Sequence, residues 1–342
     1  MNFMSDNVSG AAPEILAALA RANEGSVPSY GADPHTAAVE RRLAALFGTE
    51  VAVFPVATGT AANALALSVM TPPHGAVYCH ADGHINVDEC GAPELFTAGA
   101  KLIGLPGAGG KLSAATLEQT LARAHFGFVH AAQPAALSLS QASEAGTVYS
   151  PAEVAALCDT AKKYGLRVHM DGARFANAVA GLGCHPAEVT WKAGIDALSF
   201  GATKNGALAA EAVVFFDKTL AAEFGYRRKR GGHLFSKMRF LSAQLDAYLT
   251  DGLWLRLAGH ANAMARRLAD GLAALPGASL RHPVQANEVF VTLPEAVVAG
   301  LEARGFGFYR WDGTLIRLVA AWNTAEADVE ALLAAARELA GD

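Results

Sequence analysis

Short runs of β-forming residues alternate with alanine-rich stretches of helical period through most of this 342-residue chain. That alternation is typical of a mainly parallel sheet whose strands are joined and covered by helices. We therefore expect an α/β fold with one wide sheet of seven strands. The expected strands are VAVFP at 51–55, AVYC at 76–79, KLIGL at 101–105, ALSLS at 136–140, LRVHM at 166–170, DALSF at 196–200 and EAVVFF at 211–216.

Two of the expected helices have readable ends. Asp33 and Ser150 each stand directly before a proline, which is the order of an N-cap followed by the first helical residue. Gly48 and Gly165 close the two helical patterns, as glycine often does after the last turn.

The pattern changes in the last third of the chain. From about Leu220 to Ala274 it is long and helical, and shorter strand and helix units follow it. Those units are VFVTL at 289–293, LIRLV at 315–319 and a last helix from Thr324. We expect an N-terminal arm and a large domain over residues 1–250, and a smaller C-terminal α+β domain over residues 251–342.

Composition and charge exclude several classes of protein. With 52% hydrophobic residues the chain can bury a large core without disulfides or metals, and its four cysteines show no metal-binding spacing. A net charge of -5 provides no basic surface for a nucleic-acid backbone. The opening residues MNFMSDNVSG lack the pattern of a signal peptide, and no apolar run has bilayer length. We expect a cytoplasmic protein with no nucleic-acid or membrane partner.

Two residues that could take part in catalysis stand at the ends of two expected strands. Asp171 ends the strand before GAR, and Lys204 follows the next strand in the Gly-rich motif SFGATKNG. Ligands of open α/β sheets gather at the carboxyl ends of the strands. A pyridoxal-phosphate (PLP) site needs a lysine for a Schiff base and an acidic group at the pyridine nitrogen. The ordinary alternative is a helix-capping aspartate and a solvated loop lysine.

A third motif, TGTAANALAL from Thr58 to Leu67, opens a helix after the first strand. The free backbone N–H groups and the dipole of such a helix start favour a phosphate dianion, and Thr60 adds a hydroxyl. An ordinary strand-to-helix turn is the alternative. The glycine-rich stretch GLPGAGGKL at 104–112 lacks the P-loop spacing, so we expect a turn there.

Histidines and one arginine complete the candidate residues. The triplet HADGH contains His80, Asp82 and His84, which is weak evidence for a metal site, and we expect no metal. In a PLP site His84 would lie flat on the pyridine ring and help to move a proton. Arg317 interrupts the apolar strand LIRLV and needs a carboxylate partner, which is either a ligand or a structural acid.

Taken in order, these motifs resemble the low-specificity L-threonine aldolase family of fold-type-I PLP enzymes, in the aspartate aminotransferase superfamily. The resemblance covers nearly the whole chain, and implies a mainly parallel sheet with helices on both faces. Its landmarks are SDN at 5–7, YGADPHTAAVE at 30–40, TGTAAN at 58–63, DECGAPE at 88–94, HMDGARFANA at 169–178, FGATKNG at 200–206, SKMRFLSA at 236–243 and IRLV at 316–319. DECGAPE, GATKNG and TWKAG at 190–194 are similar to a bacterial branch that includes phenylserine aldolases.

The resemblance also implies a role for each matching residue. Lys204 corresponds to the Schiff-base lysine, Asp171 to the acid at the pyridine nitrogen, and His84 to the histidine on the ring. Gly59 and Thr60 correspond to the phosphate site, and Arg317, with Ser5 and Arg174, to the site of the substrate carboxylate. Arg174 would alternatively contact the phenolic oxygen of the cofactor. His130 falls where relatives have a second active-site histidine.

In this family the active sites form between subunits, as a dimer or a tetramer. Tyr30 and the basic run from Arg227 to Arg230 would then reach a neighbour's cofactor. The run reads RRKRGGHLFSK where the family has RKMxGGGMRQ. Because of this difference Lys229 has two possible roles: it binds a phosphate, or it belongs to a solvated charged face.

The implied reaction is cleavage of a β-hydroxy-α-amino acid to glycine and an aldehyde. Another PLP enzyme, an aminotransferase or a decarboxylase, would share the lysine, the aspartate and the phosphate site. A non-catalytic nucleotide-binding protein is disfavoured because neither G-x-G-x-x-G nor a P-loop is present. A hydrolase is disfavoured because G-x-S-x-G is absent.

Overall fold

The computed structural model describes residues 1–341; Asp342, the last residue of the expected C-terminal domain, lies outside them. The strands are β1 (Ala52–Val56), β2 (Gly75–His80), β3 (Lys101–Leu105), β4 (Gln133–Ser140), β5 (Arg167–Gly172), β6 (Ala197–Gly201), β7 (Glu211–Phe215), β8 (Ser279–Leu280), β9 (Glu288–Thr292), β10 (Tyr309–Asp312) and β11 (Leu315–Val319). The α-helices are α1 (Pro13–Ala22), α2 (Pro34–Phe47), α3 (Gly59–Met70), α4 (His84–Val87), α5 (Ala92–Phe96), α6 (Ala114–Leu121), α7 (Pro151–Lys163), α8 (Phe175–Leu182), α9 (Ala221–Arg230), α10 (Arg239–Leu249), α11 (Leu253–Ala273), α12 (Glu295–Ala303) and α13 (Glu326–Ala340).

The expected wide sheet is confirmed. Its seven strands lie in the order β1-β7-β6-β5-β4-β2-β3, and all pairs are parallel except the two that β7 makes. Every expected strand is present within a few residues of its expected bounds. Fully buried strands such as β6 and β7 carry near-continuous apolar runs because both faces of this sheet are covered.

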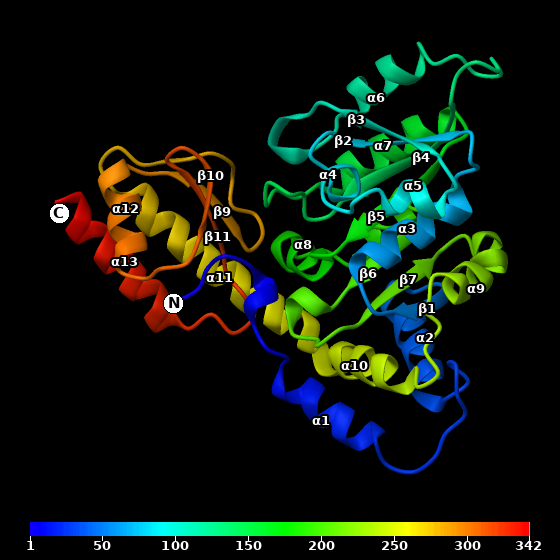
Figure 1. Ribbon diagram of the computed structural model, residues 1–342, viewed down its shortest axis with the longest axis horizontal. Helices are drawn as coiled ribbons and strands as arrows, with labels where there is room; N and C mark the ends of the chain where they lie inside the picture. Colours follow the sequence, from blue (N-terminus) through cyan, green and yellow to red (C-terminus); the bar gives the residue numbers. More distant parts are fainter. Residues whose placement is uncertain (342) are drawn as a thin grey trace.

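Helices cover both faces of this sheet (Figure 1). Val213 and Phe215 of β7 pack in an apolar cluster with residues of α3 and α9. Val214, between them, belongs to the cluster that contains residues of α2, α7, α8 and α10. Successive side chains of a strand point to opposite faces, and the two clusters are therefore the two covering layers.

The expected helix ends are also confirmed. The Asp33 side chain accepts a hydrogen bond from the Thr36 N–H at the start of α2, and Gly48 ends that helix with φ +65°. Ser150 and Glu153 form a capping box at the start of α7. The long helical stretch after Leu220 is divided into α9, α10 and α11. Residues 231–238 and 250–252, between these helices, are not α-helical.

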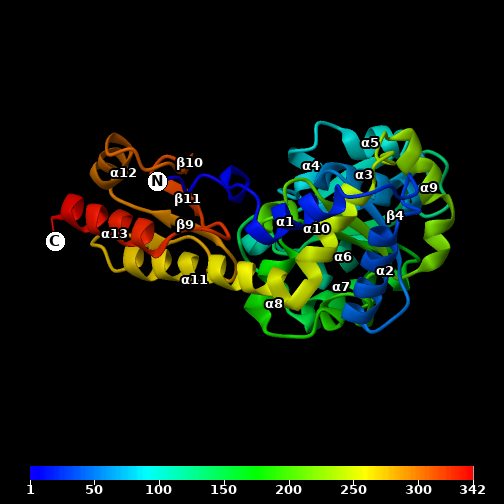
Figure 2. The ribbon, with the colours of Figure 1, turned by 90° about the horizontal axis from the view of Figure 1, so that it is seen from below.

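A second, antiparallel sheet of order β10-β11-β9-β8 forms a separate apolar cluster with α11, α12 and α13. Figures 1 and 2 show two lobes, with α11 running from one to the other. The N-terminal segment crosses to the smaller lobe: Phe3 is 1% exposed in its cluster, and the Phe3 N–H donates to Gly307 O. A division of the chain at residue 251 stays a prediction. Within residues 1–341 no helix is both long and apolar enough to span a membrane.

One buried histidine ties together the middle of the large sheet. His169 of β5 is fully buried, and its Nδ1 and Nε2 lie 2.9 Å and 3.0 Å from the hydroxyl groups of Ser138 and Ser199. Burial lowers the pKa of His169 to about 4. The neutral imidazole donates one hydrogen bond and accepts the other from these two hydroxyl groups. Because a buried charge is unfavourable, His169 stabilises the sheet only while it is uncharged.

Acid is therefore expected to destabilise the apoprotein through His169. The unfolded chain binds this proton near the ordinary histidine pKa and the folded chain only near 4, so stability is lost as pH falls between these values. The loss should reach about 2 kcal/mol between about pH 8 and about pH 5. Urea unfolding at both pH values checks it. The difference in stability between wild type and His169→Gln should shrink on acidification, whereas for the exposed His125→Gln it should stay constant.

Candidate active site

A cavity of about 370 Å³ opens where β4, β5 and β6 end and α3 begins. This is the edge of a parallel sheet at which ligands bind. Six of the residues predicted from the sequence line it together: Gly59, Thr60, His84, Asp171, Arg174 and Lys204.

One wall of the cavity is the start of α3. The Thr58 side chain caps this helix by accepting a hydrogen bond from the Ala61 N–H, at 3.2 Å. The N–H groups of Gly59 and Thr60 belong to the first turn, where a helix provides no carbonyl partner. They and the helix dipole make this wall suited to a phosphate.

Asp171 lies on β5 and is 6% exposed. Its Oδ2 accepts from Asn63 Nδ2 at 2.8 Å, and its Oδ1 accepts from the Ala173 N–H at 3.0 Å. Both donors are neutral, and the carboxylate is held in place without a counter-charge from them. Such a group suits a cationic partner in the cavity, for example a protonated pyridine nitrogen.

Lys204 lies in a 3-10 turn directly after β6. The next residue fixes this turn, because Asn205 Nδ2 donates to Tyr248 Oη at 2.7 Å and to Trp254 O at 2.8 Å. The backbone around Lys204 is therefore rigid, while its side chain faces the cavity.

Glu211 of β7 lines the same cavity, and burial raises its pKa to about 7.

His84 begins α4, and its imidazole is turned toward Glu89, with Nδ1 and Oε1 2.8 Å apart. This hydrogen bond raises the pKa of His84 above its ordinary value. The other members of the HADGH triplet do not join it. The Asp82 side chain is 78% exposed and lies 3.8 Å from His80 Nδ1.

The arginines expected at a substrate carboxylate lie in one polar cluster. Arg174 makes two hydrogen bonds with Asp6, at 2.7 and 3.0 Å, and lies 3.5 Å from Glu288. Burial opposes ionisation of Asp6, but Arg174, Lys204 and Asn287 together outweigh it and the Asp6 pKa is lowered. Arg317 Nη1 lies 3.9 Å from Glu288, and its Nε is buried without a hydrogen-bond partner among the described residues. Ser5 adjoins Asp6 and does not line the cavity.

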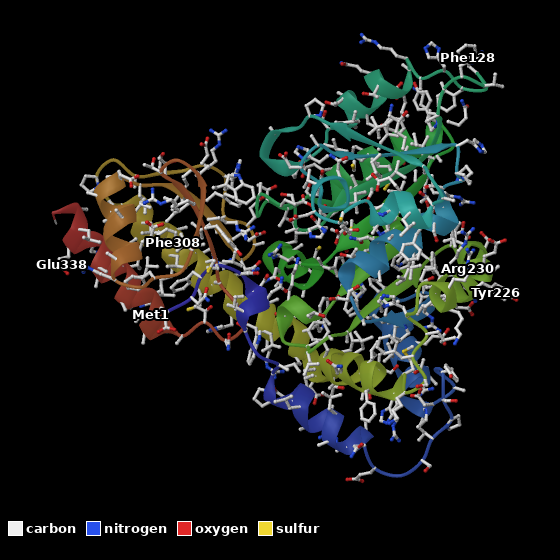
Figure 3. All side chains as sticks on the ribbon, viewed as in Figure 1. Met1, Phe128, Tyr226, Arg230, Phe308 and Glu338 are labelled. Atoms are coloured by element: carbon white, nitrogen blue, oxygen red, sulfur yellow. The ribbon has the colours of Figure 1, made fainter. Side chains whose placement is uncertain are left out.

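Arg317, like Ser5, does not line the cavity, and three further predicted residues lie away from it in their own chain. His130 is exposed in the turn before β4, at the opposite end of that eight-residue strand from the cavity, roughly 25 Å away at the rise of a strand. The structure thus does not bring His130 to this cavity. Lys229 lies over the ring of Tyr30 at 5.0 Å, in a separate surface depression beside α9. Figure 3 shows Tyr226 and Arg230 of that helix pointing outward.

The rival phosphate loop at 104–112 is a turn, as expected. Its lysine is occupied elsewhere: Lys111 Nζ lies 2.6 Å from Glu153 Oε1 and also donates to Val148 O. No group of this turn belongs to the cavity lining.

Comparison with known proteins adds independent evidence. The beta-eliminating lyase family matches residues 2–296 of the chain. A low-specificity L-threonine aldolase of a Pseudomonas species is 46% identical, over 99% of this chain and 96% of the relative. The chain belongs to the beta-eliminating lyase family and, within it, to the threonine aldolases.

Solved structures agree with this membership. A threonine aldolase of Leishmania major matches with a TM-score of 0.93 at 30% identity, covering 99% of both chains. A serine palmitoyltransferase of Sphingomonas wittichii matches with a TM-score of 0.71 at 19% identity, over 99% of this chain and 86% of that one, and shows the shared fold alone. The fold is that of fold-type-I PLP enzymes, and the protein is a PLP-dependent lyase.

The cavity of this threonine aldolase family member fits PLP on the grounds of its own geometry. A helix start suited to a phosphate, a buried carboxylate fixed by two neutral donors, and a lysine in a rigid turn face one space. Those are the three groups that PLP requires.

Several polar residues of the lining were missed as site residues, among them Asn63, Glu89, Glu144 and Glu211. Asn63 is 1% exposed inside the apolar helix α3, and a buried amide at such a position needs hydrogen-bond partners. That is the signal that sequence reasoning had available. Glu89 and Glu144 lie in loops, and nothing in their spacing predicts that they meet His84.

Proposed function

We propose that the protein cleaves L-β-hydroxy-α-amino acids between Cα and Cβ to glycine and an aldehyde, with PLP held in this cavity by Lys204. The observation that carries the proposal is that Lys204, Asp171 and the start of α3 line one cavity in a chain that belongs to the threonine aldolases. When bound, PLP accepts the electrons of the breaking bond.

The placement of the cavity residues supports a role for each of them. Lys204 would bind the cofactor covalently, Asp171 would face its pyridine nitrogen, and Gly59 and Thr60 would bind its phosphate. Asp171 is suited to that role because it is buried and fixed by Asn63 and Ala173. His84 would lie against the ring.

Arg317 and Arg174 would hold the substrate carboxylate, near Ser5. The surroundings of Arg317 support this role. Its nearest carboxylate, Glu288, is beyond hydrogen-bond distance, and its Nε has no hydrogen-bond partner among residues 1–341. Arg174 is already paired with Asp6 and lines the cavity. A second role for Arg174 is contact with the phenolic oxygen of PLP.

Arg317→Ala is expected to weaken glycine binding by roughly 10- to 150-fold, because a guanidinium-carboxylate hydrogen bond contributes about 1.5–3 kcal/mol. PLP affinity should change little. Spectral titration with glycine measures the first and dialysis the second. Arg310→Ala is the matched control, since Arg310 lies on the adjacent strand and pairs with Glu295 and Glu302. Unchanged glycine affinity in Arg317→Ala would return this residue to a structural role.

We also propose that the active enzyme contains at least two chains, as a dimer or tetramer. Tyr30 is 49% exposed and contacts Lys229 outside the cavity of its own chain, which suits contact with a neighbour's cofactor. Sedimentation of the purified protein measures the assembly, and a lone chain with full activity would contradict this. A cytoplasmic location remains a prediction.

Aryl substrates such as phenylserine should be cleaved at least as well as threonine. The support is the similarity of DECGAPE, TWKAG and GATKNG to the phenylserine aldolase branch. The chemistry favours breadth as well, because the cofactor and Arg317 hold the glycine portion that all these substrates share. Apolar contacts at the aldehyde side discriminate by only about 1–3 kcal/mol per methylene-sized difference.

The test is to incubate the enzyme and PLP separately with L-threonine, L-phenylserine and L-serine, and to measure glycine, acetaldehyde and benzaldehyde. Glycine with the matching aldehyde supports the proposal. Keto acid or amine without glycine would indicate an aminotransferase or a decarboxylase. Cleavage of threonine with phenylserine untouched would keep the aldolase and refute the aryl preference.

A further inference from the structure

A chain of hydrogen bonds runs along one wall of the cavity, from Asp171 through Asn63 and Glu89 to His84. Asn63 Nδ2 donates to Asp171 Oδ2 and to Glu89 Oε1, each at 2.8 Å. Glu89 Oε1 also lies 2.8 Å from His84 Nδ1. In the proposed function Asn63 fixes Asp171, and Glu89 has no role.

The amide of Asn63 can lie in one orientation only. Both protons of its NH₂ group point to carboxylates, and the flipped amide would instead place Oδ1 against both of them. Its Oδ1 is buried without a partner among the described residues, which is the cost of this arrangement. Asn63 therefore holds Glu89 at a fixed distance from Asp171.

Glu89 in turn determines which nitrogen of His84 faces the cavity. The Glu89 side chain is 0% exposed and the His84 side chain 35% exposed. The Glu89 carboxylate can only accept a hydrogen bond, so the neutral imidazole carries its proton on Nδ1, which donates, and the Nε2 lone pair is free. Nε2 has no hydrogen-bond partner among residues 1–341, and His84 lines the cavity.

The charged groups around His84 come from four elements. Glu89 lies between α4 and α5, Asp171 on β5, Glu144 in the loop after β4 and Lys204 after β6. The hydrogen bond to Glu89 is the largest contribution to the raised pKa of His84; Asp171 adds to it and Lys204 opposes it. Glu144 accepts the His84 backbone N–H at 2.8 Å, which anchors the residue.

We propose that Glu89, held by Asn63, is the positioning residue that sets the tautomer and basicity of His84, so that His84 Nε2 receives the proton of the substrate β-hydroxyl. This proposal rests on the proposed function. The proton moves from the β-oxygen to Nε2 as the Cα–Cβ bond breaks and the C=O bond of the aldehyde forms, and the bound cofactor would hold the electron pair left on Cα. The Glu89 carboxylate stabilises the imidazolium, whose proton returns to solvent after the aldehyde leaves. Cα takes up one proton from solvent before glycine is released, so the overall proton count is unchanged.

The test compares wild type with Glu89→Gln, which keeps the shape of the side chain and removes its charge. Deuterium exchange at C2 of each histidine, read by peptide mass spectrometry at several pH values, measures the His84 pKa in the apoprotein. We expect that pKa to fall in Glu89→Gln. In the PLP-loaded enzyme, kcat for threonine should fall roughly 10- to 100-fold, less than the loss of a whole general base.

The pH profile separates positioning from a merely structural role. The acidic limb of kcat should move to lower pH in Glu89→Gln, in step with the His84 pKa, while KM stays within about twofold. Glu89→Asp, which keeps the charge, should recover much of the rate and the raised pKa. Asp82→Asn is the matched control, because Asp82 stands beside a histidine in the same loop but outside the cavity.

Each outcome decides the matter. An unchanged His84 pKa in Glu89→Gln would show that Glu89 does not govern His84. A lowered pKa with an unmoved acidic limb would show that His84 is not the proton acceptor. Loss of the raised pKa at His84 with normal exchange at the buried His169 excludes general misfolding. If wild type releases no glycine and aldehyde, the proposed function fails, but the pKa readout still tests the link between Glu89 and His84.

Discussion

Replacing Lys204 by alanine is expected to abolish covalent PLP binding and to lower turnover by about three orders of magnitude or more. The reason is that Lys204 supplies the amine to a cavity whose other walls offer a phosphate site and a buried carboxylate. The yellow colour of the purified protein and the rate of glycine formation measure the two effects.

Lys192→Ala is the matched control for this prediction. Lys192 is exposed and lies over the ring of Trp191, outside the cavity lining. Its replacement should leave both colour and turnover unchanged. A Lys204→Ala protein that keeps its colour and a rate within a few-fold of wild type would refute the assignment.

Asp171→Asn is expected to slow bond cleavage by on the order of 100-fold or more, while PLP still binds to Lys204. A neutral partner no longer favours the protonated pyridine ring, and the loss of such a fixed charge at a developing charge costs about 10²- to 10³-fold. Most of the effect should appear in the rate of the chemical step, measured by single-turnover kinetics with threonine.

Asp196→Asn controls for the loss of a buried carboxylate. Asp196 is 9% exposed and accepts the Val168 N–H at 2.7 Å, so its replacement weakens the same sheet without reaching the cavity. It should lower stability and leave the single-turnover rate nearly intact. If Asp171→Asn behaves in the same way, Asp171 is only a structural residue.

The sequence was sufficient for the large sheet because local physics decides it. Both faces of the sheet are covered, and each strand carries an apolar run bounded by turn residues, as in DALSF and EAVVFF. The helix ends were predictable for the same reason, since the caps at Asp33 and Ser150 each act on an N–H group three residues away.

The contacts within the site were only partly predictable. Lys204, Asp171 and Gly59 could be placed together because they follow strands that end at one edge of the sheet. The partner of Arg174 is Asp6, which is 168 residues away in the chain, and no spacing rule predicts such a pair. The N-terminal segment reaches it because Phe3 packs in the smaller lobe.

The histidines illustrate the same limit. The family resemblance predicted that His84 lies at the cofactor site, but its hydrogen bond with Glu89 depends on the turn between α4 and α5. His130 precedes its strand rather than following it, and the direction of β4 therefore carries it to the far edge of the sheet. Strand direction was the available signal for that difference.

The most direct test of the central claim is borohydride reduction of the PLP-loaded wild-type enzyme, followed by peptide mapping. Reduction makes the bond between PLP and its lysine permanent. We expect a pyridoxyl label on Lys204, in the peptide that contains GATKNG. Recovery of the label on Lys192 or Lys237 instead would contradict the assignment of this cavity as the active site.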